Sequence, residues 1–291
     1  MQASGPMTRP AAAAALFVLL AGCKSAGSPA GGPGVDAPRG TSSDASSSPS
    51  DGTAASSCAG STAVFCEDFE DRAVGPATSS RWTTDTMNGT LAVDTARARG
   101  ARSLHVNTTG NGRARILVPI APALAGNSMF GRMYAYITAF PTAPLSAHYT
   151  LVEASGASTD PNKTLVRPIG GQYETNNAQP AADYYGPGSD GGASGDWTNW
   201  QVSAPAEPGK WVTFEWQLSA ADNQISVWID GVARPELTVS RTDHGGEAVD
   251  FVFPTFTQIW FGWWLYQGNP TPDEYELWID DIAIDSAKIG C

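Results

Sequence analysis

The sequence is poor in cysteine, histidine and basic residues, and each scarcity narrows the possible functions. It contains 4 Cys and 3 His, and we find no zinc-binding spacing, phosphate loop, nucleophile elbow or cofactor fingerprint. Lys and Arg together number 17 against 29 Asp and Glu, which gives a net charge of -12. A field of that sign disfavours nucleic acids and anionic membranes as partners. We therefore expect neither zinc chemistry nor nucleic-acid binding.

A membrane-spanning run is also missing. The apolar run 11–20 follows Arg9 and is shorter than the roughly 20 residues that a transmembrane helix needs. Small residues and a cysteine come next, in Leu20-Ala-Gly-Cys23, an order typical of an export signal. The tetrad resembles the bacterial lipobox, so we expect residues 1–22 to be a signal peptide and Cys23 to carry the lipid. An ordinary secretory signal with an accidental cysteine is the alternative.

The segment after the lipobox lacks the apolar residues that a core needs. Residues 23–57 are almost entirely Ser, Gly, Ala, Pro, Thr and Asp, which predicts a flexible tether. In bacterial lipoproteins an Asp after the anchor is the usual inner-membrane signal, so Lys24 favours the outer membrane or cell surface. The lipid is then the expected membrane contact. Residues 58–291 are long enough for one β domain, which we expect to be a monomer.

Few cysteines remain for cross-linking. With Cys23 lipidated in an oxidising compartment, one disulfide and one leftover thiol is the simplest count. The sequence leaves the pairing among Cys58, Cys66 and Cys291 open. If the first and last strands run antiparallel, counting outward along them brings Cys291 closer to Cys58. We therefore predict a disulfide between these two.

Amphipathic helices are missing, whereas alternating or β-rich runs follow one another between turn signals. Asp230-Gly231 predicts a tight hairpin turn, because both residues tolerate positive φ. The segment 172–200, rich in Gly, Asn, Asp and Tyr, predicts a long functional loop. We expect an all-β, concanavalin-like jelly-roll sandwich in a single domain. The expected strands span 64–69, 91–95, 103–108, 113–118, 131–139, 148–154, 211–218, 224–229, 259–266 and 274–284.

Several motifs occur in one order over nearly all of residues 58–291: Glu67-Asp-Phe-Glu70, Ala147-His-Tyr-Thr150, Ile169-Gly-Gly-Gln172, Ile259-Trp-Phe-Gly-Trp-Trp-Leu-Tyr-Gln-Gly268, Leu277-Trp-Ile-Asp-Asp-Ile-Ala-Ile284 and Lys288-Ile-Gly-Cys291. Together they resemble the core domain of the fungal cellulose-induced secreted protein family. The resemblance implies a jelly roll similar to glucuronan and alginate lyases, with a structural Ca²⁺. It also implies a polysaccharide as partner, with a polyuronate as one candidate.

The resemblance places four catalytic candidates. Tyr266 matches the tyrosine that lyases of this fold place in the cleft, where a phenol can supply acid and base steps. His148 is a candidate base. Arg167 or Gln172 would hold the substrate carboxylate, so that the C5 proton becomes acidic.

Two departures from the family pattern favour a protein without catalysis. Leu165 replaces a cleft histidine, and Pro168 separates the arginine from the motif that follows it. Tyr266 and His148 also have plainer interpretations, as a tyrosine at the sheet rim and a satisfied strand histidine. The two hypotheses are a surface-anchored lyase that acts on uronic-acid glycan by β-elimination, and a non-catalytic carbohydrate-binding lipoprotein.

The resemblance also places a metal site. Glu70 and Asp280 match the family's calcium carboxylates, and main-chain oxygens from Arg99 to Arg102 would complete the shell. Asp281 is the alternative ligand, because adjacent strand residues point to opposite faces. A pair of surface acids is the interpretation without a metal.

Aromatic and basic side chains suggest further contacts with substrate. Arg113 and Arg115 alternate on an expected strand, and we interpret them as a solvated face. Flat indole faces pack well on pyranose rings, although most Trp residues should be core. The expected sugar contacts are Trp197, Trp200, Trp263, Trp264 and Asn176.

Overall fold

The β-rich runs of the sequence form thirteen strands, and helix in the described residues is confined to two 3-10 turns, Ala125–Asn127 and Pro235–Leu237. The structure, a computed structural model, describes residues 57–120, 124–144, 147–161, 164–174, 182–189, 204–240 and 253–290. No helix in those ranges has the length and apolar character to cross a membrane. The strands are β1 (Phe65–Glu67), β2 (Gly75–Pro76), β3 (Thr83–Asp94), β4 (Ser103–Pro119), β5 (Met129–Ile137), β6 (His148–Ala157), β7 (Leu165–Glu174), β8 (Ala182–Ser189), β9 (Trp211–Ser219), β10 (Gln224–Ile229), β11 (Val232–Ala233), β12 (Thr255–Leu265) and β13 (Glu274–Asp285).

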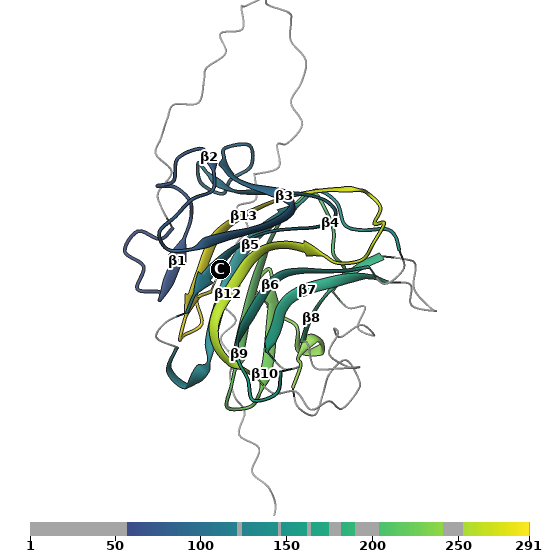
Figure 1. The fold of residues 1–291 in the computed structure, drawn as a ribbon. Helices are drawn as coiled ribbons and strands as arrows, with labels where there is room; N and C mark the ends of the chain where they lie inside the picture. Colours follow the sequence, from purple (N-terminus) through teal and green to yellow (C-terminus); the bar gives the residue numbers. More distant parts are fainter. Residues whose placement is uncertain are drawn as a thin grey trace, which may run out of the picture.

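The sheet is curled, so that strands that are not neighbours in the hydrogen-bonded strand order pack against each other. Neighbouring strands follow the antiparallel order β11-β10-β9-β5-β13-β4-β12-β6-β7-β8, while β3 pairs with β4 and β1 pairs with β13. β7 nevertheless contacts β9 and β10 across the interior. Figure 1 shows β6, β7 and β8 side by side at one end of this curved sheet. The layered all-β arrangement confirms the predicted jelly-roll class.

β4 connects the two halves of the curled sheet, the half that contains β13 and the half that contains β12. Its first half pairs with β13 and its second half pairs with β12. Gly110, at φ 59°, and Gly112 lie between the halves, and a Cβ on Gly112 would come within 2.8 Å of the Thr108 Cβ. Glycine is therefore required where the strand passes from one layer to the other. The sequence predicted two separate strands here, and the structure joins them.

β8 corrects the prediction of a long irregular loop over 172–200. It pairs with β7 as the last strand of the sheet, with Tyr184 opposite Gln172. Its Gly186-Pro-Gly188 sequence has low strand propensity, which conceals the strand from a reading of periodicity. β7 was not predicted either, and it contains Pro168.

Large aromatic side chains fill the interior. Tyr149, Trp263 and Tyr275 are fully buried and form a stack, with ring centroids 5.0 and 5.3 Å apart. The prediction that Trp263 contacts sugar is therefore wrong, because its indole lies on the core side of β12 while Trp264 lies on the other side. The Asp230-Gly231 turn is confirmed, with φ of 51° and 75°.

The disulfide joins Cys58 to Cys66, with Cα atoms 5.6 Å apart. The predicted Cys58–Cys291 pairing is wrong, although its premise holds: β1 and β13 are antiparallel. The prediction counted residues along two strands and left out the turn before β1. That turn brings Cys58 back to Cys66, eight residues later in the sequence. Several predictions lie outside the described residues: the signal peptide, Cys23, most of the tether, Asn176, Trp197, Trp200 and Cys291.

Candidate functional site

Strands β4, β12, β6 and β7 are consecutive neighbours, and each turns alternate residues away from the core. We call the surface that these side chains form the polar face. Charged and aromatic groups share it, in contrast to the apolar side that faces the interior. The polar face comprises Arg113 and Arg115 of β4, Trp260 and Trp264 of β12, His148 and Glu153 of β6, Arg167 and Gln172 of β7, and Tyr266, which directly follows β12.

Tyr266 and His148 lie together at one end of the polar face. Their rings are nearly parallel, with centroids 5.9 Å apart. Gln267 orients the imidazole: its Oε1 accepts from the His148 main-chain N–H, which leaves its Nε2 3.0 Å from Nδ1 of His148. Because an amide nitrogen donates, Nδ1 accepts, and the neutral ring carries its proton on Nε2.

Arg167 reaches Tyr266 from β7. Its guanidinium carbon lies 5.6 Å from the centroid of the Tyr266 ring, and its Nε donates to Oε2 of Glu153 at 3.1 Å. The other Glu153 oxygen accepts from Trp260 Nε1 at 2.8 Å. The Glu153 side chain is 7% exposed, so its carboxylate is a fixed anchor for both partners. Pro168 lies where the β7–β8 register shifts, and Arg167 still reaches the site.

Gln172 lies on β7 directly opposite His148 on β6. Its side chain is buried, and its Nε2 donates to Oε2 of Glu174 at 3.3 Å. Leu165 begins the same strand, opposite Ser155 and seven residues before Gln172. The structure therefore brings the four catalytic candidates together on adjacent strands, with leucine at the position that departs from the family.

Arg113 and Arg115 are not the solvated face that we predicted. Asp85 of β3 contacts Nε and Nη2 of Arg113 at 2.8 and 3.0 Å, and Nε and Nη2 of Arg115 at 2.9 and 2.8 Å. The Arg115 guanidinium also lies 4.6 Å from the Trp260 ring and 5.5 Å from the Trp264 ring. Burial acts to raise the pKa of Asp85, but the hydrogen bonds from both arginines outweigh it and hold that pKa below its usual value.

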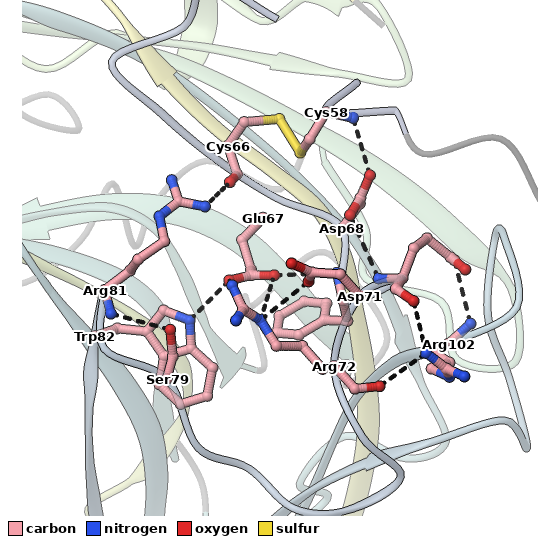
Figure 2. Close-up of polar contacts among 12 residues, drawn as sticks. Cys58, Cys66, Glu67, Asp68, Asp71, Arg72, Ser79, Arg81, Trp82 and Arg102 are labelled. Carbon is pink, nitrogen blue, oxygen red and sulfur yellow. Dashed lines mark hydrogen bonds and ion pairs between the residues drawn. A yellow bond between two sulfur atoms is a disulfide. The ribbon is translucent and has the colours of Figure 1, made fainter. Parts of the chain in front are cut away.

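A second polar cluster surrounds Glu67 of β1 (Figure 2). Glu67 is buried and accepts from Arg72 Nη2 at 2.7 Å and from Trp82 Nε1 at 3.0 Å. Arg81 donates to the Cys66 carbonyl at 2.7 Å. A hollow of about 350 Å³ lies beside the disulfide. Arg72 neutralises the buried carboxylate, and the cluster ties β1 to the segment between β1 and β3.

Glu70 and Asp280 approach each other beside the loop that precedes β4. Asp280 Oδ2 accepts from the Arg99 main-chain N–H at 2.8 Å, and Glu70 Oε1 accepts from the Ala101 N–H at 2.8 Å. Burial raises the pKa of Asp280 to about 7; the Arg99 N–H opposes this rise, and the charges of Asp281 and Glu70 add to it. Two acids are thus held together without a side-chain cation on Asp280 among the described residues.

This acidic pair fits a hard cation in charge and donor type. Asp281 fits less well, because its carboxylate already contacts Arg99 Nε at 2.8 Å and the Ser57 hydroxyl. In the described ranges no three His, Cys, Asp or Glu side chains group as metal ligands, so main-chain oxygens would have to complete a site at Glu70 and Asp280.

Asp183 of β8 is a buried acid that has no neutralising partner among the described residues. Its Oδ1 has no hydrogen-bond partner in the described part of the chain, and burial raises its pKa to about 8. Burial and then the charge of Asp183 raise the pKa values of the buried Tyr149 and Tyr275. The carboxyl is therefore mainly protonated at neutral pH.

The sequence reasoning missed four residues that organise the polar face. Glu153 could have been noticed in the sequence, because it is an acid inside the apolar run Leu151-Val-Glu-Ala154. Asp85 carried no such signal, since it lies in a Thr-rich segment and finds Arg115 only through strand pairing. The other two are Trp260 and Gln267.

Comparison with known proteins identifies the family. A sequence model of the polysaccharide-lyase-like family, described as the Cip1-like core domain, matches residues 68–287. The solved structure of the cellulose-induced protein Cip1 is similar over 78% of this chain and 99% of its own, with 20% identity and a TM-score of 0.54. The binding domain of botulinum neurotoxin DC covers 78% of this chain and 48% of its own, with 14% identity and a TM-score of 0.43. No curated relative matches. The chain belongs to the polysaccharide-lyase-like family of Cip1-like core domains.

Proposed function

We propose that this protein is a polysaccharide lyase that cleaves a uronic-acid-containing glycan by β-elimination. Membership of a polysaccharide-lyase-like family supports a carbohydrate-related function. One observation carries the finer proposal: Tyr266, His148, Arg167 and Gln172 meet on the polar face of three adjacent strands. A tyrosine, an oriented imidazole and a carboxylate-binding group are the set that proton abstraction next to a uronate carboxylate requires.

The chemistry balances with these residues alone. The C5 proton is removed, the C4–O bond breaks, a C4–C5 double bond forms, and the departing oxygen takes a proton. Tyr266 as phenolate accepts the C5 proton and returns it to the departing oxygen. Nε2–H of His148 and the amide of Gln172 donate to the substrate carboxylate, which makes the C5 proton more acidic. The Arg167 guanidinium beside the ring favours the phenolate.

The test is ultraviolet absorbance of the unsaturated product when the purified protein is incubated with glucuronan, alginate or pectate. We expect turnover of at least one of them, and a loss of roughly 100-fold or more in Tyr266→Phe, since general acid–base catalysis contributes that much. If the wild type gives no more product than Tyr266→Phe on all three, the lyase proposal fails.

A non-catalytic carbohydrate-binding protein is the second candidate. It is favoured by Glu153, which already neutralises Arg167, and by Leu165 at the position of a family histidine. Retention of the protein by an acidic glycan in affinity electrophoresis, without unsaturated product, would select this candidate over the first.

We further propose that Cys23 anchors the chain by lipid at the cell envelope and that Ca²⁺ binds at Glu70 and Asp280. The lipobox-like tetrad supports the anchor, and the acidic pair supports the metal. Incorporation of labelled palmitate that disappears in Cys23→Ser tests the anchor; equal labelling of the two proteins would exclude it.

A further inference from the structure

We propose that Arg113, Arg115 and Trp264 form a subsite for a carboxylate-bearing sugar, next to the sugar held at Tyr266. This inference rests on the proposed function and adds to it the residues that select a charged neighbour in the glycan. The polar face would then bind at least two successive sugars rather than one.

The position of Trp264 links the subsite to the reacting centre. Its ring centroid lies 5.1 Å from that of Tyr266, and the two planes are tilted by 60°. On its other side, Trp264 pairs across the β12–β4 ladder with Arg113, whose guanidinium carbon lies 5.7 Å from the indole. A glycan that extends from Tyr266 toward β4 would therefore contact the Trp264 indole, on which a pyranose ring packs, and then the Arg113 guanidinium.

The two arginines have donors to spare. Asp85 accepts one hydrogen bond from Nη2 of Arg113 and one from Nε of Arg115, and its Oδ2 lies 2.8 Å from Nε of Arg113 and from Nη2 of Arg115. Nε of Arg113 and Nη1 of Arg115 are buried and have no hydrogen-bond acceptor among the described residues. Two guanidiniums that share one carboxylate keep a net charge of about +1, and the planar guanidinium matches a carboxylate as a two-pronged donor. Arg113, 24% exposed, is the more accessible donor, and Arg115 is 14% exposed.

Gly262 explains how Arg115 reaches this place. It lies directly opposite Arg115 and between Trp260 and Trp264 on the polar side of β12. A Cβ there would lie 2.7 Å from the Arg115 Cβ and 2.2 Å from the Ala114 carbonyl oxygen. The missing side chain leaves room for the guanidinium between the two indoles.

The charge of the polar face is uneven along its length. Glu174 contacts Gln172 at the β7 end, and Glu153 neutralises Arg167 in the middle. The excess positive charge therefore lies at the β4 end. A chain of net charge -12 repels a polyanion at long range, and this local positive charge offsets that repulsion at the β4 end of the polar face.

The test measures binding in the full chain carrying Tyr266→Phe, so that no turnover is needed. In that background we compare Arg113→Gln, Arg113→Lys and a matched control, Arg97→Gln, whose guanidinium lies over Tyr136 and Trp278 away from the polar face. Calorimetry uses an oligoglucuronate, a neutral β-glucan oligomer of equal length and a sulfated oligomer. Thermal midpoints establish that each variant is folded.

We expect Arg113→Gln to weaken oligoglucuronate binding by about tenfold or more, the effect of one charge-assisted hydrogen bond, and Arg113→Lys to weaken it less. Arg97→Gln should match the parent, and neutral-oligomer affinity should be unchanged in all three. Trp264→Leu should weaken both oligomers, because stacking does not depend on charge.

Equal oligoglucuronate affinity in Arg113→Gln and Arg97→Gln would overturn the subsite, as would a Tyr266→Phe parent that does not bind oligoglucuronate. Tighter, Arg113-dependent binding of the sulfated oligomer would overturn its assignment to a carboxylate. Absence of lyase product from the protein with Tyr266 intact would overturn the proposed function alone, since these affinities are measured without catalysis.

Discussion

Buried acids in this protein differ by the partners that they have. Glu67 and Glu153 have the same kinds of partner: each carboxylate accepts hydrogen bonds from one arginine and from one tryptophan Nε1. Asp183 has neither kind of partner in the described part of the chain, and its raised pKa is the result. The first two acids are therefore charged anchors, whereas the third is buried as a neutral group.

Replacing Glu153 by Gln should lower the free energy of unfolding by about 3 kcal/mol, because it removes the buried carboxylate that pairs with the Arg167 guanidinium and accepts from Trp260. Urea denaturation measures the change. Glu207→Gln is the matched control, since it breaks an exposed ion pair with Lys210 and should leave stability unchanged. Equal midpoints for the two variants would contradict the anchoring role of Glu153.

Asp183 should make stability depend on pH. In the unfolded chain its carboxyl titrates near 3.8, and in the folded chain near 8. Between these values the folded state holds a proton that the unfolded state has lost, so this residue's contribution falls as pH rises from about 4 to about 8, by at most about 1.4 kcal/mol per unit. Asp183→Asn removes this dependence and should gain stability relative to wild type between pH 5 and 8.

Thermal midpoints of both proteins at several pH values test this prediction. Asp222→Asn, a change of an exposed acid, serves as the control and should run parallel to wild type. A constant difference between Asp183→Asn and wild type across the window would show that Asp183 is charged in the folded protein.

At the scale of elements, the close approach of β4 and β12 builds the polar face. β4 brings Arg113 and Arg115, β12 brings the tryptophans, and Gly262 allows the two backbones to meet. The β12–β6 register shifts between Phe261 and Trp264, at this glycine. A local irregularity of β12 thus positions the indole next to Tyr266.

Gly262→Ala should destabilise the fold by about 2 kcal/mol or more. Its φ of 156° suits glycine, and the added Cβ would meet the Ala114 carbonyl oxygen at 2.2 Å. Gly268→Ala is the control, because a Cβ there has open space. Urea midpoints for the two variants decide: a Gly262→Ala protein as stable as Gly268→Ala would mean that β4 and β12 separate easily.

At the scale of the whole molecule, the proposed Ca²⁺ would join the two ends of the domain. Glu70 follows β1, Asp280 lies in β13, and the loop before β4 contacts both. A ligand that binds the folded state alone stabilises it, by about 2.7 kcal/mol at a concentration 100 times its Kd. For a domain of this size that corresponds to roughly 5–10 °C in Tm.

Chelation with EDTA should therefore lower the Tm of the wild type by several degrees, and Glu70→Gln should melt at the same temperature with and without EDTA. Asp71→Asn, a change of the exposed neighbouring acid, should keep the sensitivity. A wild type that is indifferent to EDTA would exclude a stabilising metal at this site.

The all-β class, the Asp230-Gly231 turn and the family resemblance could be predicted from the sequence, whereas the antiparallel pairing of the first and last strands was only assumed. The predicted features depend on short-range alternation, on turn chemistry and on motifs read in order. The sequence also named Tyr266, His148, Arg167 and Gln172, which the structure brings together.

The folded structure sets the features that depend on partners distant in sequence. It buried Trp263 and left Trp264 beside Tyr266, because the side that faces the core is fixed by sheet packing. It joined Cys58 to Cys66 through a turn that strand counting ignores. It also turned Arg113 and Arg115 from a solvated pair into a cluster with Asp85, since only the β3–β4 pairing brings that carboxylate to them.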